Sequence, residues 1–136
     1  MREPIRLWIE ALRNPEAKQA KGGLTIKNDD GSHKGDCCLG VACKITPGIV
    51  AYGSGFPAMI NRLKVAYDEE INFLPLAARR WLGLKTKQPA VRLSEGNWVY
   101  LNDLNDDDNA TFAQIADIIE EQDENWDGTR REARSE

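Results

Sequence analysis

Apolar residues recur at helical spacing in three segments of the chain, residues 4–13, 74–84 and 111–119. Positions i, i+3, i+4 and i+7 lie on one face of an α-helix, so each segment is expected to bury one stripe and expose the rest. The last segment has the clearest start, because Thr111 and Gln114 form a T-x-x-Q capping box. The three stripes consist of Ile5, Trp8, Ile9 and Leu12; of Leu74, Ala78, Trp81 and Leu82; and of Phe112, Ile115, Ala116 and Ile119.

Shorter runs between these segments have the composition of strands and turns. Residues 24–26 and 98–101 are β-prone, and residues 28–31, Asn-Asp-Asp-Gly, predict a hairpin turn after the first run. Residues 46–57 are rich in Gly and Pro and predict a loop with a brief strand. A weaker helical spacing follows, carried by Met59, Ile60, Leu63 and Tyr67.

These elements predict an α+β fold, with about three main helices flanking a small antiparallel sheet. A chain of 136 residues suits one domain, which we expect to span residues 1–126. Residues 127–136 have no apolar pattern and are expected to form a disordered tail.

The stretch GDCCLGVACKI, residues 35–45, fits two local structures. A strand would place every second residue from Cys37 to Ile45 on one face. A helix would be capped by Asp36 and would bury a stripe that begins at Cys38. The small residues of this stretch let neighbouring elements approach closely, which favours a buried helix.

Three cysteines within seven positions raise the question of thiol chemistry. A catalytic thiolate at Cys37 or Cys38 needs a base within reach, yet the only histidine, His33, lies four or five residues upstream, and Asp36 would raise the thiol pKa. A zinc site needs a second pair of ligands, and neither Cys nor His occurs after Cys43. We therefore expect the cysteines to pack in the core, with no metal and no cofactor.

Composition limits where the protein acts. No apolar run approaches the roughly 20 residues that span a bilayer, and the charged N-terminal segment lacks the apolar region of a secretory signal, so a cytoplasmic protein without membrane contact is expected. The net charge of −4 divides into +4 over residues 1–65 and −8 over residues 66–136. No basic stripe or nucleic-acid-binding motif is present, so direct DNA binding is not expected.

Two surface regions are candidates for binding. The stretch between the first helix and the cysteines is rich in lysine and glycine and could hold the phosphate of a nucleotide, because ammonium groups and exposed N–H groups attract anions. An acidic run and a tryptophan near the C-terminus could instead contact a protein partner. The candidate anion-binding residues are Lys18, Lys21, Lys27, His33 and Lys34, and the candidate partner-binding residues are Asp106, Asp107, Asp108 and Trp126.

Four motifs occur in a fixed order along the chain. They are W-x-x-A-L from Trp8, C-C-L-G-V-x-C from Cys37, L-P-x-x-x-x-x-W-L-G-L from Leu74, and L-N-D from Leu101 followed by T-F-x-x-I-A-D-x-I. In this order the chain resembles a group of small proteins encoded by bacteriophages and prophages. The resemblance implies a phage context and a shared fold, and it brings no catalytic residues.

The expected function is therefore binding. We expect an accessory protein in the host cytoplasm that binds a host protein or sequesters a nucleotide signal, and thereby inhibits a host defence. Two alternatives stay open, a small thiol-dependent enzyme that uses Cys37 or Cys38 and a phage structural or assembly factor. The sequence sets no oligomeric state.

Overall fold

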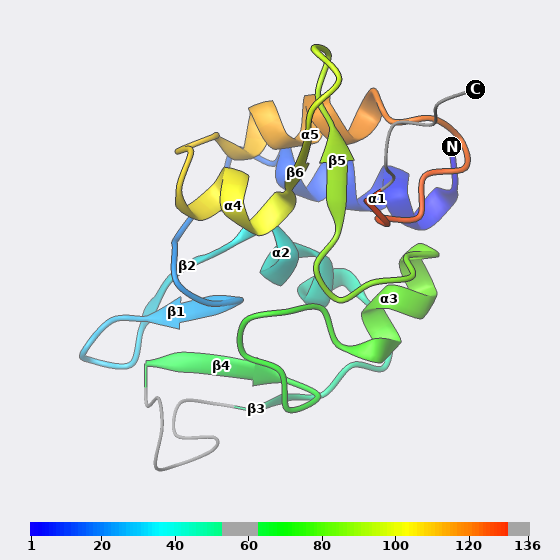
Figure 1. Ribbon diagram of the computed structural model, residues 1–136. Coiled ribbons are helices and arrows are strands. Elements are labelled where there is room, and N and C mark those ends of the chain that lie inside the picture. The colour runs from blue at the N-terminus through cyan, green and yellow to red at the C-terminus, as the bar shows by residue number, and fades with distance from the viewer. Residues whose placement is uncertain (53–62, 131–136) are drawn as a thin grey trace.

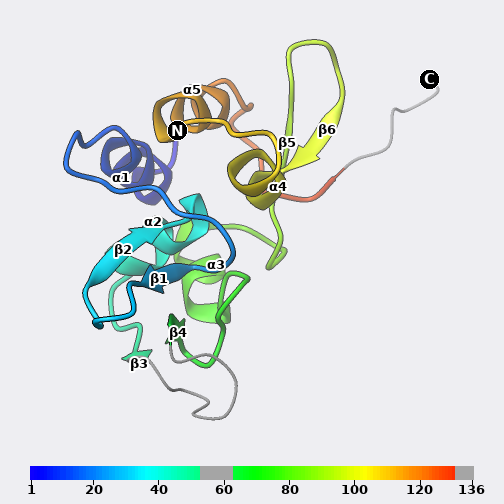
Figure 2. The ribbon, with the colours of Figure 1, turned by 90° about the vertical axis from the view of Figure 1, so that its left-hand side faces the viewer.

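Two helices from opposite ends of the sequence lie side by side and form one layer of the molecule. The computed structural model describes residues 1–52 and 63–130. Helices α1 (Glu3–Leu12) and α5 (Phe112–Glu120) pack against each other along the apolar stripes that the sequence predicts (Figures 1 and 2). Both predicted helices are confirmed.

Local hydrogen bonds explain where α5 begins. The backbone N–H of Gln114 donates to Thr111 Oγ1 at 3.1 Å, and the backbone N–H of Thr111 donates to Gln114 Oε1 at 2.9 Å. Each side chain thus satisfies a donor that the first turn leaves unpaired, so the capping box is confirmed.

The cysteine-rich stretch forms α2 (Cys38–Ile45), which lies between the α1–α5 layer and the sheet (Figure 1). Its residues from Cys38 to Cys43 are all buried, because elements pack on more than one side of it. Gly40 shows how close this packing is: a Cβ atom there would lie 1.8 Å from Leu24 O. The preference for a buried helix over a strand is confirmed.

The helix start differs by one residue from the prediction. Cys37, rather than Asp36, is the N-cap, and its Sγ accepts a hydrogen bond from the Gly40 N–H at 3.4 Å. Asp36 cannot cap because it is the last residue of a strand and its carboxylate is bound by side chains of the sheet region.

Four short strands form an antiparallel sheet in the order β2-β1-β4-β3. The hairpin turn predicted for residues 28–31 joins the first two strands, as expected. The strands are β1 (Thr25–Lys27), β2 (His33–Asp36), β3 (Ala51–Tyr52) and β4 (Lys64–Tyr67). Tyr67 therefore belongs to a strand and not to the weak helix proposed from its spacing, whereas Met59 and Ile60 lie outside the described residues.

The remaining elements are α3 (Leu76–Leu82), β5 (Ala90–Arg92), β6 (Trp98–Tyr100) and α4 (Leu101–Asp106). Strands β5 and β6 pair as an antiparallel hairpin that projects beside α5 (Figure 2). The described part of the chain thus has five helices and is α+β, as predicted, although it has more helices than the three expected. The additional helix α4 is not among the predicted elements, and it forms because Leu101 and Leu104 share a buried face.

The hydrophobic core includes residues from Ile5 to Trp126, and backbone hydrogen bonds hold the chain in place beyond Trp126. The Lys85 N–H donates to Asp127 O and the Ala90 N–H donates to Gly128 O, both at 2.8 Å. The packed region therefore extends past the boundary placed at residue 126, while residues 131–136 of the expected tail lie outside the described residues.

Candidate functional site

The three thiols, the first candidate for chemistry, lie inside the core. Cys37, Cys38 and Cys43 are 3%, 0% and 0% exposed and form no disulfide. Burial raises the pKa of Cys37 to about 12 and raises the pKa of the other two thiols as well. A nucleophilic thiolate requires the opposite, a lowered pKa and access for a substrate.

A polar cluster surrounds Asp36, the residue directly before Cys37. Asp36 is 2% exposed, and its Oδ1 accepts from Thr25 Oγ1 at 2.5 Å and contacts His33 Nε2 at 3.2 Å. Lys44 Nζ donates to Asp36 Oδ2 at 3.1 Å from α2. Since the Thr25 hydroxyl donates to the carboxylate, the Tyr67 hydroxyl 2.8 Å away is left to donate to Thr25, and burial raises the pKa of Tyr67 to about 12. Both oxygens of this almost fully buried carboxyl group thus have hydrogen-bond partners, as buried polar groups require.

A β-bulge brings His33 to this cluster. Lys27 pairs with His33 and Ile26 with Gly35, so Lys34 is the extra residue of β2. Residues three apart on a regular strand point to opposite faces, and the extra residue returns His33 to the face of Asp36.

The chemistry of this cluster favours a structural role. A nucleophile–base pair would place a hydroxyl or thiol on the imidazole, but the hydroxyl of Thr25 donates to the carboxylate itself. The cluster therefore balances the charge of Asp36 and connects the hairpin to α2. No pattern in the sequence predicts that Lys44 contacts Asp36. The two residues are eight positions apart, and only the packing of α2 on the hairpin brings them together.

The predicted anion-binding residues are divided by the fold. Lys18, Lys27 and Lys34 lie with His33 on or beside β2, where Lys18 O accepts from the Asp36 N–H at 2.8 Å. Lys21 turns away and its Nζ donates to Asn109 Oδ1 between α4 and α5. Among the described residues no group of three or more His, Cys, Asp or Glu side chains is placed to hold a metal ion.

Only part of the acidic run is exposed to solvent and without a side-chain partner among the described residues. Asp107 and Asp108 are exposed, whereas Asp106 accepts a hydrogen bond from Asn105 Nδ2 at 2.8 Å. Burial and the three neighbouring carboxylates raise the pKa of Asp103. Asn105 itself is fully buried and connects α4 to α2, because its Oδ1 accepts from the Cys38 N–H at 3.2 Å.

Trp126 is buried and is not the exposed anchor that its charged sequence neighbours suggested. It is 6% exposed, and its Nε1 donates to Ala90 O at 2.7 Å. The loop after α5 folds back on β5, which the charge pattern of residues 120–127 does not reveal. The indole nevertheless reaches the wall of a pocket.

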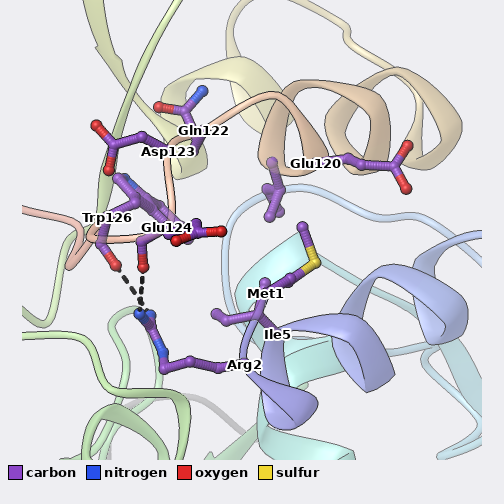
Figure 3. Close-up of a pocket in the computed structure, with 9 residues that line it drawn as sticks. Met1, Arg2, Ile5, Glu120, Gln122, Asp123, Glu124 and Trp126 are labelled. Carbon is purple, nitrogen blue, oxygen red and sulfur yellow. Dashed lines mark hydrogen bonds between the residues drawn. The ribbon is translucent and has the colours of Figure 1, made fainter.

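This pocket lies between the start of α1 and the loop that follows α5 (Figure 3). It has a volume of about 190 Å³. Its apolar side is formed by Ile5, Ile119 and Trp126, and the acidic residues Glu120, Asp123 and Glu124 also line it. The Glu124 carboxylate turns toward the pocket, whereas those of Glu120 and Asp123 turn away from it (Figure 3).

Arg2 closes one end of the pocket. Its Nη1 and Nη2 donate to the backbone carbonyls of Glu124 and Trp126 at 3.4 and 2.9 Å (Figure 3). Its Nε donates to Leu82 O at 3.1 Å. A guanidinium is therefore already bound by oxygen acceptors at this end. Sequence reasoning missed the pocket because its two halves lie more than one hundred residues apart.

The fold and the site define a small α+β domain with buried thiols and a small pocket lined by apolar residues and by charged residues of both signs. No helix among the described residues is long and apolar enough to cross a bilayer. The chain belongs to the family described as Domain of unknown function (DUF8296), whose model matches residues 1–123. No curated protein and no solved structure matches the chain.

Proposed function

We propose that the protein is a phage-encoded accessory protein that binds a host protein in the host cytoplasm and inhibits a defence function. The phage context rests on the order of the four motifs, and the cytoplasmic site rests on the composition of the N-terminal segment. The burial of the three thiols supports binding over thiol catalysis, since a core thiol meets no substrate.

The observation that carries the proposal is the pocket between α1 and the loop after α5. Small-molecule sites commonly measure about 300–1,000 Å³, so a volume of about 190 Å³ is small for a nucleotide. Its lining carries charges of both signs, because Arg2 lies there with Asp123 and Glu124, so the pocket itself selects neither an anion nor a cation. The size of the pocket therefore disfavours a nucleotide, and the net charge of −8 over residues 66–136 favours a protein partner with a basic surface.

The polar cluster at Asp36 points in the same direction. Two of the basic groups near this cluster, the His33 imidazole and the Lys44 ammonium, already contact the Asp36 carboxylate. A nucleotide phosphate would have to compete for these two groups with the Asp36 carboxylate, which is part of the fold.

Affinity capture from host lysate tests the proposal. The tagged protein should retain a host protein at about 0.1 M salt and release it near 1 M, where the Debye length falls from about 10 to about 3 Å. Mass spectrometry of the eluate should detect protein and no stoichiometric nucleotide.

Three results would contradict the proposal. A nucleotide in the eluate that raises the melting temperature of the purified protein would identify a nucleotide-binding protein. Co-sedimentation with virions would identify a structural or assembly factor. Capture of neither a protein nor a nucleotide from a competent host would remove the basis for binding.

A further inference from the structure

The hairpin of β5 and β6 has one edge that the fold covers and one edge that it leaves open. We propose that the open edge, formed by the outward backbone groups of Trp98 and Tyr100, receives an extended segment of the protein partner as an added β-strand. This inference rests on the proposed function and names the surface and the kind of segment that it binds.

The outer edge of β5 is occupied by groups of the loop that follows α5. The side-chain amide of Gln122 pairs with Arg92 as a strand would, because the Arg92 N–H donates to Gln122 Oε1 and Gln122 Nε2 donates to Arg92 O, both at 3.0 Å. The Ala90 N–H donates to Gly128 O at 2.8 Å, and Trp126 Nε1 donates to Ala90 O at 2.7 Å. The backbone groups that β5 directs outward are thus all paired.

The register of the hairpin shows which groups of β6 point the other way. In an antiparallel pair, two residues opposite each other direct their N–H and C=O groups either toward each other or both outward. Arg92 and Ala90 direct theirs outward, and Trp98 and Tyr100 are the residues opposite them. The N–H and C=O of Trp98 and the N–H of Tyr100 therefore point away from β5, and none of the three is hydrogen-bonded among the described residues.

The open edge lies on the outside of the molecule. Figure 2 shows β6 on the side of the hairpin away from α5. The Tyr100 carbonyl is not part of this edge, because Tyr100 is the N-cap of α4 and the carbonyl of an N-cap accepts the first bond of its helix. Three backbone groups thus remain for an added strand.

Other features of the fold show that an open edge is an exception in this protein. The outer edge of β2 is covered by the chain before β1, since the Ala20 N–H donates to Asp36 O and the Asp36 N–H donates to Lys18 O, both at 2.8 Å. Unpaired edges commonly carry Lys or Pro, which discourage pairing with another chain. β6 has the sequence Trp-Val-Tyr, which favours strands and contains neither residue.

The side chains of β6 indicate which residues the added strand carries. Val99 packs against the core, and the alternation of side chains along a strand places Trp98 and Tyr100 on the opposite face, where both are half-buried. Aromatic side chains pair favourably with aromatic and β-branched side chains across two strands. We therefore expect such a residue at every second position of the segment.

Charge favours a foreign segment over a second copy of the chain. Residues 66–136, which include β6, carry a net charge of −8, so two copies paired along β6 would bring two acidic halves together. Within the hairpin the charges of Arg92 and Glu95 cancel, so the preference comes from the acidic half as a whole. Lysine or arginine next to the apolar residues of the segment would be attracted to it.

Amide hydrogen exchange of the full chain, resolved by NMR, tests the open edge with a defined probe. In the free protein the N–H groups of Trp98 and Tyr100 should exchange at least about ten-fold faster than the paired N–H groups of Arg92 and Val99. An excess of acetyl-Lys-Val-Thr-Val-Lys-amide should slow exchange at Trp98 and Tyr100. The control acetyl-Lys-Pro-Pro-Pro-Lys-amide has the same charge but no N–H between its lysines, and it should not.

Tyr100 offers a matched pair of variants, because its φ of −76 fits proline. Tyr100→Pro removes the edge N–H, and Tyr100→Ala removes the same ring but keeps the N–H. The N–H of Tyr100 is not bonded to β5, so both variants should keep the hairpin, which slow exchange at Val99 verifies. Tyr100→Pro should bind the valine peptide and the host partner at least about five-fold more weakly than Tyr100→Ala, because it leaves a carbonyl of the added strand unpaired.

Three results would overturn the inference. They are equal binding by the two variants, equal effects of the two peptides, and protection of Trp98 and Tyr100 in the free protein that is lost on dilution, which would show that a second copy occupies the edge.

The lysate experiment separates this inference from the proposed function. If both variants capture the same host protein equally, the edge is not the contact and the binding function stands. If the unaltered protein captures nothing while the valine peptide alone still slows exchange at Trp98 and Tyr100, the edge pairs with strands and the proposed function fails.

Discussion

Alkylation of the native protein with iodoacetamide tests whether the thiols take part in function. Burial raises the pKa of Cys37 from 9.0 to about 12. At pH 8 a thiol of pKa 9.0 is about one-tenth thiolate, and one of pKa about 12 is about one ten-thousandth thiolate, so the reactive fraction falls about a thousand-fold. Lack of access lowers the rate further, because all three sulfur atoms are buried.

The assay compares labelling rates by intact mass spectrometry in buffer and in guanidinium chloride. We expect native labelling at least about a thousand-fold slower than labelling of the unfolded chain, with no site modified ahead of the others. Ser94→Cys places a thiol at an exposed position and supplies the control, since it should react at an ordinary rate in the folded protein. Rapid stoichiometric modification of Cys37 or Cys38 at neutral pH would refute this reasoning and favour the thiol enzyme.

Three further predictions concern the packing around α2. Gly40→Ala would place a methyl group 1.8 Å from Leu24 O, whereas ordinary contact begins at 3.4 Å. It should therefore lower the free energy of unfolding, measured by urea titration, by about 2–4 kcal/mol. The control Gly48→Ala meets open space at φ +75 and should lower it by about 1 kcal/mol. Asn105→Leu leaves a buried backbone N–H and a buried carbonyl unpaired and should cost about 2–5 kcal/mol by the same measurement; a cost below about 1 kcal/mol would disprove the role assigned to its amide. Stability should be nearly constant from pH 7 to pH 9 and fall above it, because burial raises the pKa of the thiols and of Tyr67, so the unfolded chain loses these protons first. Tyr67 alone, whose pKa is moved from 10.0 to about 12, accounts for roughly 2 kcal/mol by pH 12, and thermal melts that show no alkaline loss would contradict this.

Local signals were sufficient wherever neighbours in the sequence decide the structure. The capping box at Thr111 and Gln114 and the apolar stripes of α1 and α5 are short-range features, and the structure reproduces both. Gly83 ends α3 in the left-handed conformation, at φ 77, which glycine adopts readily after the last helical residue.

Other elements could not be assigned from local pattern. The segment Leu101–Asp106 is mostly polar, and it is helical because Leu101, Leu104 and Asn105 are buried against neighbouring elements. The N-cap of α2 is Cys37 and not the predicted Asp36, because the Asp36 carboxylate is bound by the Thr25 hydroxyl, eleven residues away in the sequence.

The sequence by itself determined the α+β class, the three main helices and the central place of the cysteines, because hydrophobic periodicity and small residues act over a few neighbouring positions. Only the tertiary structure decided which polar residues meet. It brought His33 and Lys44 to Asp36, buried Trp126, and formed a pocket from residues 1–5 and 119–126. Contacts between residues so far apart depend on how the whole chain packs, and no local pattern encodes that packing.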